Sequence, residues 1–100
     1  MQQLKSTFTS KGIPVFVGEY GATDKSFAHA QNEKYRCYFY EYVCKAVKDI
    51  GGVPCCWDNG WTGNYGFALF DRKTNSIAHQ DLIDAIMRGT SGENYTIKQP

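Results

Sequence analysis

Residues 13–18 of the chain read Ile-Pro-Val-Phe-Val-Gly, a short run that is apolar and rich in β-branched side chains. Such a run is typical of a strand buried on both faces of a parallel sheet. Pro14 stands near the start of the run, where a missing N–H group does least harm to a sheet. Residues 53–57, Val-Pro-Cys-Cys-Trp, have the same character. The sequence therefore predicts two short buried strands.

Three segments around these strands carry apolar residues at helical spacing. Residues 32–50 repeat apolar side chains every three or four positions, and residues 79–88 do the same. A shorter helix within residues 1–10 is expected to end before Gly12. The predicted order of helix, strand, helix, strand, helix implies an α/β fold with parallel strands joined by a crossover helix. Two strands cannot close a core, so we expect the chain to be part of a larger sheet.

Local signals refine the long central helix. Asn32 is a suitable N-cap, and Glu41 and Lys45 are spaced to form an i,i+4 ion pair. Residues 58–75 are predicted to form a long loop rich in Gly, Asn and aromatic residues, and loops of this length are often functional.

Composition excludes several classes of protein. The 100 residues carry a formal net charge of +1 with scattered Lys and Arg, which argues against a nucleic-acid partner. No apolar run is long enough for a membrane span or a signal peptide. The four cysteines lack the spacing of a zinc site, and Cys37 and Cys44 would lie about 10 Å apart along a helix, too far for a disulfide. We expect buried thiols and no cofactor or metal.

Polar residues follow both predicted strands. Glu19 comes directly after the first strand and Trp57-Asp58-Asn59-Gly60 after the second. Ligands of parallel α/β proteins bind at these carboxyl ends, so both positions are candidates for a site. Taken alone, each motif has a plain alternative: Glu19 in a structural ion pair, and Trp57 in the core before an Asn-Gly turn.

Together the motifs are more specific. A strand ending in Gly18-Glu19-Tyr20-Gly21, a helix, a strand ending in Trp57-Asp58-Asn59-Gly60, and then residues 66–72 resemble the end of family 5 glycoside hydrolases. The resemblance covers roughly residues 12–89 and implies strands 7 and 8 of a TIM (β/α)8 barrel, or about two βα units. It divides the chain into a partial catalytic barrel at 1–89 and a polar tail at 90–100.

The resemblance also implies roles for residues. Glu19 would be the catalytic nucleophile of a retaining endo-β-1,4-glucanase, or cellulase. Trp57 would be the aromatic platform for the sugar, with Asn59 and Trp61 as further substrate contacts. The family's acid/base glutamate lies in an Asn-Glu-Pro motif, which this chain lacks. We therefore expect the isolated chain to be inactive, with a β-glucan as the partner of a secreted parent enzyme.

Two alternatives stay open: a non-catalytic carbohydrate-binding piece and a plain small α/β domain. The sequence does not choose between cellulose, xyloglucan, mannan and mixed-linkage glucan.

The remaining polar residues are predicted to have structural roles. We expect Asp71 and Arg72 to brace the last loop, Arg36 to lie in the central helix, and His29 and His79 to lie at the surface or in loops. Tyr20 is expected to point away from Glu19, into packing. Exposed strand edges predict association with other chains.

Overall fold

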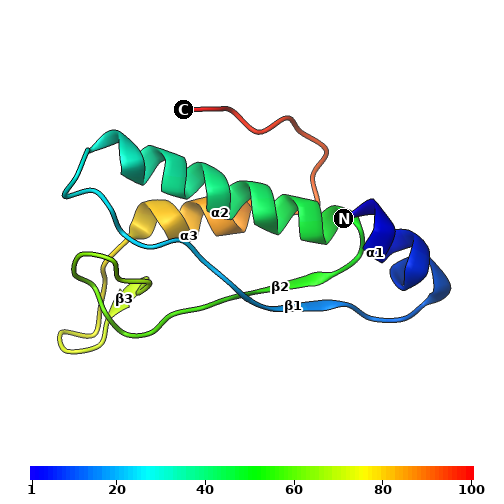
Figure 1. The fold of residues 1–100 in the computed structure, drawn as a ribbon, viewed down its shortest axis with the longest axis horizontal. Coiled ribbons are helices and arrows are strands. Elements are labelled where there is room, and N and C mark those ends of the chain that lie inside the picture. Colours follow the sequence, from blue (N-terminus) through cyan, green and yellow to red (C-terminus); the bar gives the residue numbers. More distant parts are fainter.

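The computed structural model describes all 100 residues and places two helices beside a small parallel sheet (Figure 1). The chain begins with a short helix and a 3-10 turn, and the elements then alternate as expected before a small hairpin intervenes. In chain order they are α1 (Gln2–Thr7), η1 (Thr9–Lys11), β1 (Phe16–Tyr20), α2 (Gln31–Asp49), β2 (Val53–Cys56), β3 (Phe70–Asp71), β4 (Ser76–Ile77) and α3 (Gln80–Gly89). None of the helices combines the length and the apolar character needed to cross a lipid bilayer.

Strands β1 and β2 pair in parallel across the α2 crossover, which confirms the predicted α/β arrangement. The first strand starts later than expected, at Phe16 rather than Ile13, because Pro14 has no N–H to donate to a ladder. The pairing starts where Val53 N donates to Val15 O at 2.9 Å and persists until Trp57 N donates to Tyr20 O at 2.8 Å. Glu19 therefore lies inside β1 rather than after it.

The two faces of this sheet differ sharply. Tyr20 is buried in the core, and Val17 and Cys56 pack against that core from the same side. On the opposite face Phe16 is 67% exposed and its ladder partner Val53 is 45% exposed. The expectation of strands buried on both faces is wrong for this chain, because nothing in it covers the second face.

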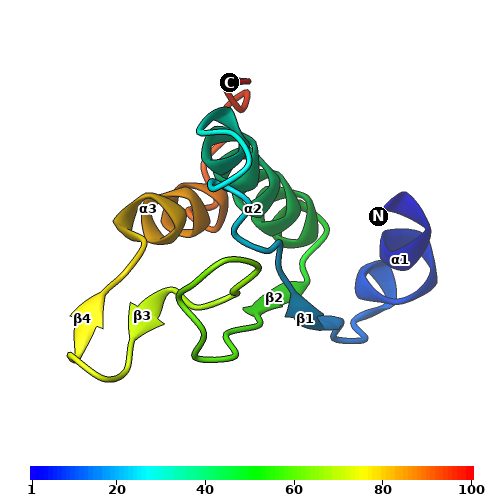
Figure 2. The same ribbon diagram turned by 60° about the vertical axis from the view of Figure 1, so that its left-hand side comes forward.

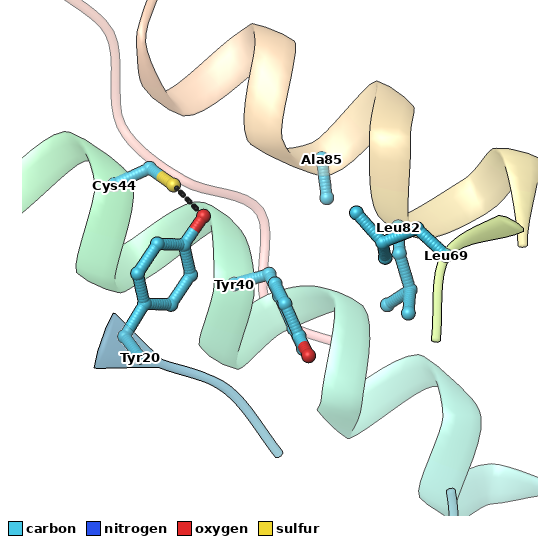
Figure 3. Close-up of a cluster of buried hydrophobic side chains, with 6 residues drawn as sticks. All are labelled: Tyr20, Tyr40, Cys44, Leu69, Leu82 and Ala85. Atoms are coloured by element: carbon cyan, nitrogen blue, oxygen red, sulfur yellow. Dashed lines mark hydrogen bonds between the residues drawn. The ribbon is translucent and has the colours of Figure 1, made fainter. Parts of the chain in front are cut away.

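The core lies between the sheet and the two long helices. Its buried residues come from β1, α2, α3 and the segment before β3, and Figure 3 shows them facing one another: Tyr20, Tyr40, Cys44, Leu69, Leu82 and Ala85. The Tyr20 hydroxyl and the Cys44 sulfur lie 2.9 Å apart, and the rings of Tyr20 and Tyr40 meet edge to face at 5.5 Å. Tyr20 thus packs inward, as predicted from its position next to Glu19.

A hairpin was not predicted. Strands β3 and β4 pair antiparallel, with Phe70 opposite Ile77, inside and just beyond the segment expected to be loop. Figure 2 shows this hairpin beside the β1–β2 sheet, with which it forms no ladder. Its turn is held by the Asp71 carboxylate, which accepts bonds from the backbone N–H groups of Lys73 and Thr74. Strands of two residues carry too short a pattern to predict.

Several local expectations need correction. Helix α2 begins at Gln31, and the Asn32 amide donates to the carbonyl of Lys25 instead of capping the helix. Glu41 pairs with Arg88 of α3 at 2.9 Å, while Lys45 pairs with Asp49 at 2.8 Å. Tertiary packing supplies the partner of Glu41 from α3, and Lys45 pairs instead with the acid one turn further along α2.

The last segment also differs from a free tail. The Tyr95 hydroxyl donates to Glu41 Oε2 at 2.9 Å, and the Lys45 ammonium lies 5.2 Å from the Tyr95 ring centre. The tail therefore crosses α2 near this tyrosine. All four cysteines are free; Cys44 is fully buried and the other three are partly buried.

Candidate active site

Glu19 projects from the open face of β1. The register of β1 against β2 shifts between Val17 and Tyr20, so both of these side chains reach the core although they lie three residues apart. Glu19 lies at this irregularity and is exposed beside the buried Tyr20, so its side chain faces away from α2. The residue is exposed, and its carboxylate makes no hydrogen bond or ion pair in the structure. Within this chain, Glu19 is therefore not held in a structural ion pair.

Trp57 lies on the same face as Glu19. Cys56, the residue before it, packs against the core, and Tyr20 and Cys56 are opposite each other in the ladder. Glu19 comes directly before Tyr20, and Trp57 comes directly after Cys56. Both side chains are therefore directed to the face opposite α2. The Trp57 side chain is 44% exposed, which also excludes a fully buried core tryptophan. A carboxylate and an indole thus share one side of the sheet.

Asn59 and Asp58 shape the loop that follows. Asn59 Oδ1 accepts from Trp61 N at 3.0 Å and from Phe67 N at 3.3 Å, which leaves only its amide NH₂ for a ligand. Asp58 accepts from Gly60 N at 2.7 Å and from the N–H of Leu69 at 3.0 Å. Both side chains close turns of the backbone, so the loop geometry depends on them whether or not they touch a substrate.

The charge of Asp58 is held by these bonds. Partial burial by itself would raise the pKa of this carboxyl, but the N–H groups of Leu69 and Gly60 and the positive charge of Arg72 together lower it below its usual value. Arg72 Nη2 lies 3.3 Å from Asp58 Oδ1 and also donates to the Asp58 carbonyl. Arg72 thus braces the last loop, as expected.

Trp61 is a strongly exposed aromatic residue of the loop that carries Asn59. Its side chain is 59% exposed, and its indole N–H donates to the carbonyl of Asn64 at 3.0 Å. That bond fixes the orientation of the ring and leaves its apolar surface open to solvent. The residue is placed to stack on a ligand and cannot also donate a hydrogen bond from its indole nitrogen.

Sequence reasoning missed the importance of Arg36. This side chain is 2% exposed, and it donates from Nε to Ala22 O at 2.8 Å and from Nη2 to Gly66 O at 3.2 Å. Ala22 lies in the loop after Glu19, and Gly66 lies in the loop after Trp57. One buried guanidinium therefore joins the two loops, and only the tertiary fold reveals this.

Both histidines lie in loops, as expected, but their surroundings differ. His29 is exposed, as expected, and accepts a bond from Gln31 N. His79 is half-buried instead, with Nδ1 3.4 Å from Glu33 Oε1 and Nε2 3.9 Å from Asp24 Oδ2. No sequence spacing signals this cluster, because its members come from separate parts of the chain.

Comparison with known proteins assigns the family. A model of the family described as "Cellulase (glycosyl hydrolase family 5)" matches residues 1–63, the part that holds both β1 and β2. The chain belongs to glycosyl hydrolase family 5. Enzymes of this family are (β/α)8 barrels, so β1, α2 and β2 take the place of consecutive elements of such a barrel.

Relatives of the family 5 chain agree with this assignment. Endoglucanase A of Paenibacillus barcinonensis is 43% identical over 82 residues, which cover 82% of this chain and 20% of that protein. A family 5 xyloglucanase from Paenibacillus pabuli, solved with a ligand, superposes with a TM-score of 0.87 at 38% identity, covering 89% of this chain and 25% of that one. A broad-specificity endoglucanase from Bacteroides salanitronis gives a TM-score of 0.81 at 38% identity, with 92% and 25% covered.

The family 5 chain thus spans about a fifth of the curated relative and about a quarter of each solved structure. The open face of β1 and β2, which carries Glu19 and Trp57, is the face away from the helices. In a closed barrel, side chains on that face point toward the barrel axis.

Proposed function

We propose that this chain is the part of a retaining endo-β-1,4-glucanase that holds barrel strands 7 and 8, with Glu19 as its nucleophile. The observation that carries the proposal is the placement of Glu19 and Trp57 on one face of adjacent parallel strands. A free carboxylate beside an exposed indole suits a sugar: the indole stacks on the ring, and the carboxylate reaches the anomeric carbon. Asn59 and Trp61 extend the contact along the loop.

In this mechanism the Glu19 carboxylate attacks the anomeric carbon while a carboxylic acid protonates the departing glycosidic oxygen. The covalent glycosyl ester is then hydrolysed by water, which the second group, now a carboxylate, deprotonates. The two carboxyl groups of a retaining enzyme stand about 5–5.5 Å apart. The chain must therefore place a second carboxyl close to Glu19 if it is to act alone.

Asp58, the acid next to Trp57, is engaged by the N–H groups of Gly60 and Leu69 and by Arg72. Asp24 is bonded to Ser26 in the loop, and Glu33 and Glu41 lie on α2, on the far side of the sheet from the Glu19 side chain. We therefore infer that the isolated chain does not turn over substrate. The acid/base group and the rest of the sugar cleft would come from the other strands of the barrel, in a secreted enzyme.

The proposed substrate class is a β-1,4-linked glucan. The similar protein from P. pabuli is a xyloglucanase and the one from B. salanitronis a broad-specificity endoglucanase, so both act on glucan backbones. The aromatic surface of Trp57 and Trp61 suits any of these polymers, since stacking reads the sugar ring rather than its branches. The particular glucan is set by parts of a barrel that this chain does not supply.

The experiment has two arms. The purified chain alone is assayed for reducing sugar released from carboxymethylcellulose and xyloglucan, and no release is expected. The chain is then co-expressed with P. barcinonensis Endoglucanase A truncated before the matching segment, and activity is expected to return. Glu19→Gln should abolish the restored activity, and Glu93→Gln, in the tail, should leave it. Restored activity that survives Glu19→Gln would refute the nucleophile assignment, and activity of the chain alone would refute its incompleteness.

A second candidate, a non-catalytic carbohydrate-binding piece, is favoured by the exposure of Trp57 and Trp61, at 44% and 59%. It predicts that the chain alone binds cello-oligosaccharides. Binding should then survive Glu19→Gln and fall with Trp57→Ala. A flat titration would remove this candidate and leave the incomplete hydrolase or a plain small domain, which the co-expression arm separates.

A further inference from the structure

Three potential metal ligands meet where α2 and α3 begin. Glu33 lies in the first turn of α2, His79 is the N-cap of α3 and Asp81 is in its first turn. One ligand atom from each lies within 4.8 Å of the others. The two helices start at the same end of the molecule, on the left in Figure 1, which brings together residues 46 and 48 positions apart in the sequence.

The Glu33 carboxylate accepts no hydrogen bond, and Arg36 Nη1, also without a hydrogen-bond partner, lies 3.6 Å from its Oε1. Only 20% of the side chain is exposed, and both carboxylate oxygens are buried without a hydrogen-bond partner. A buried carboxylate without partners is costly. Apart from Arg36, whose Nη1 lies 3.6 Å from Oε1, these oxygens have no permanently charged positive partner.

The charges around the cluster do not balance. Asp24, Glu33 and Asp81 contribute three negative charges and Arg36 one positive charge, which leaves two negative charges when His79 is neutral. A divalent cation would neutralise this excess.

The histidine has the surroundings of a metal ligand. Its Nδ1 lies 3.4 Å from Glu33 Oε1, and its Nε2 faces Asp24 Oδ2 at 3.9 Å. Two ligands of a tetrahedral zinc ion, each about 2.1 Å from the metal, stand about 3.4 Å apart. A carboxylate behind the second nitrogen is the usual way to orient a metal-bound imidazole. Asp81 is exposed and keeps Oδ2 free, since Oδ1 accepts from Leu82 N.

We propose that Glu33, His79 and Asp81 form a binding site for one divalent transition-metal ion of the zinc class, with water completing the coordination. The imidazole nitrogen favours Zn²⁺ over Mg²⁺ and Ca²⁺, which prefer oxygen ligands only. Because the ligands come from both helices, the ion would fasten the start of α3 to the start of α2. The site is separate from the open face that carries Glu19, so it does not depend on the proposed hydrolase.

The test is a calorimetric titration of ZnCl₂ into the full chain with reduced thiols. Saturable binding of one equivalent is expected. Asp24→Asn should weaken it by about 10–100-fold, as loss of an orienting carboxylate does, and His79→Gln should weaken it further. The matched control is His29→Gln, which alters the other histidine, exposed in a loop, and should leave the affinity unchanged. Asp81→Asn changes an exposed side chain, so it tests the site without unfolding it; helical circular dichroism checks each variant.

Free thiols are the competing zinc ligands. Cys37 lines the same cavity as Glu33 and Asp81, so the chain with Cys37→Ser, Cys55→Ser and Cys56→Ser should bind zinc as the unaltered chain does. Its complex with Co²⁺ should lack a thiolate-to-metal charge-transfer band. The proposal is overturned by an absence of saturable zinc binding. It is equally overturned by binding that survives His79→Gln and Asp81→Asn, or by binding that is lost with the three cysteines.

Discussion

The Nε of Arg36 lies 2.8 Å from the carbonyl oxygen of Ala22, three residues beyond Glu19. The same guanidinium donates at 3.2 Å to the carbonyl of Gly66, in the segment that follows Trp57. The loops also bond directly, since Asp24 N donates to Gly66 O at 2.9 Å. The position of one candidate catalytic loop is thus coupled to the other through a buried side chain of α2.

Replacing Arg36 by methionine tests this coupling. The variant keeps most of the side-chain volume but leaves the two carbonyls without their donor and Glu33 without its cation. Removal of one partner from a buried ion pair costs about 3–5 kcal/mol, and we expect a loss of this order in the free energy of unfolding. Urea unfolding followed by helical circular dichroism, at one chain concentration, measures it.

The matched control is Arg72→Met. The Arg72 side chain is 65% exposed and pairs with Asp58 at 3.3 Å. Exposed ion pairs contribute only about 0–1 kcal/mol, so the control should unfold near the urea concentration of the unaltered chain. Equal effects of the two substitutions would show that Arg36 does not join the loops.

Gly89 sets the distance between α2 and α3. A Cβ atom at this position would lie 2.6 Å from the carbonyl oxygen of Glu41 and 2.8 Å from the Cβ of Cys44. Gly89→Ala should therefore push the helices apart and cost about 1–3 kcal/mol, as overpacking of a core does. Gly18→Ala is the control, because a Cβ there meets no atom within 4 Å. Thermal unfolding should separate the two variants, and an unchanged midpoint for Gly89→Ala would contradict the close packing.

The bonds to Asp58 predict a dependence on acid. Asp58 titrates near 3.8 in the unfolded chain, and folding lowers this pKa despite the opposing effect of burial. Its contribution to stability is therefore complete above that pH and is lost as the pH falls through the lower, folded-state pKa. Asp58→Asn should lower stability at neutral pH and flatten the decline below about pH 4.

Urea midpoints measured across that pH range check this prediction for Asp58. The control variant, Asp49→Asn, changes a carboxylate whose side chain is 55% exposed at the end of α2. It should keep the shape of the acid decline. An identical decline in the unaltered chain and in Asp58→Asn would show that the bonds from Gly60 and Leu69 do not hold the charge.

The sequence predicted those features that depend on a repeating pattern. The helical spacing of residues 32–50 located α2 to within one residue at each end, and the apolar runs located β1 and β2. The position of Glu19 relative to Tyr20 followed from the alternation of a strand. Patterns of this kind are local, so they survive whether or not the rest of a fold is present.

What the sequence did not predict depends on contacts between distant segments. The partner of Glu41 is Arg88, 47 residues away, rather than Lys45 on the next turn. The cluster of Glu33 and His79 has no spacing that a motif could describe. The β3–β4 hairpin has strands of two residues, too short for a period. Such features become visible only after packing is known.

The open face of the sheet predicts association. Phe16 is 67% exposed on a strand with an unpaired edge, opposite Val53, and exposed apolar edges pair with other chains. Phe16→Lys should therefore raise the monomer fraction without loss of helical signal, since its side chain lies away from the core. The control is Met87→Lys, which alters a residue 63% exposed on α3 and should leave the association unchanged. Size-exclusion chromatography with light scattering measures both variants; a monomeric unaltered chain would show that the open face does not drive association.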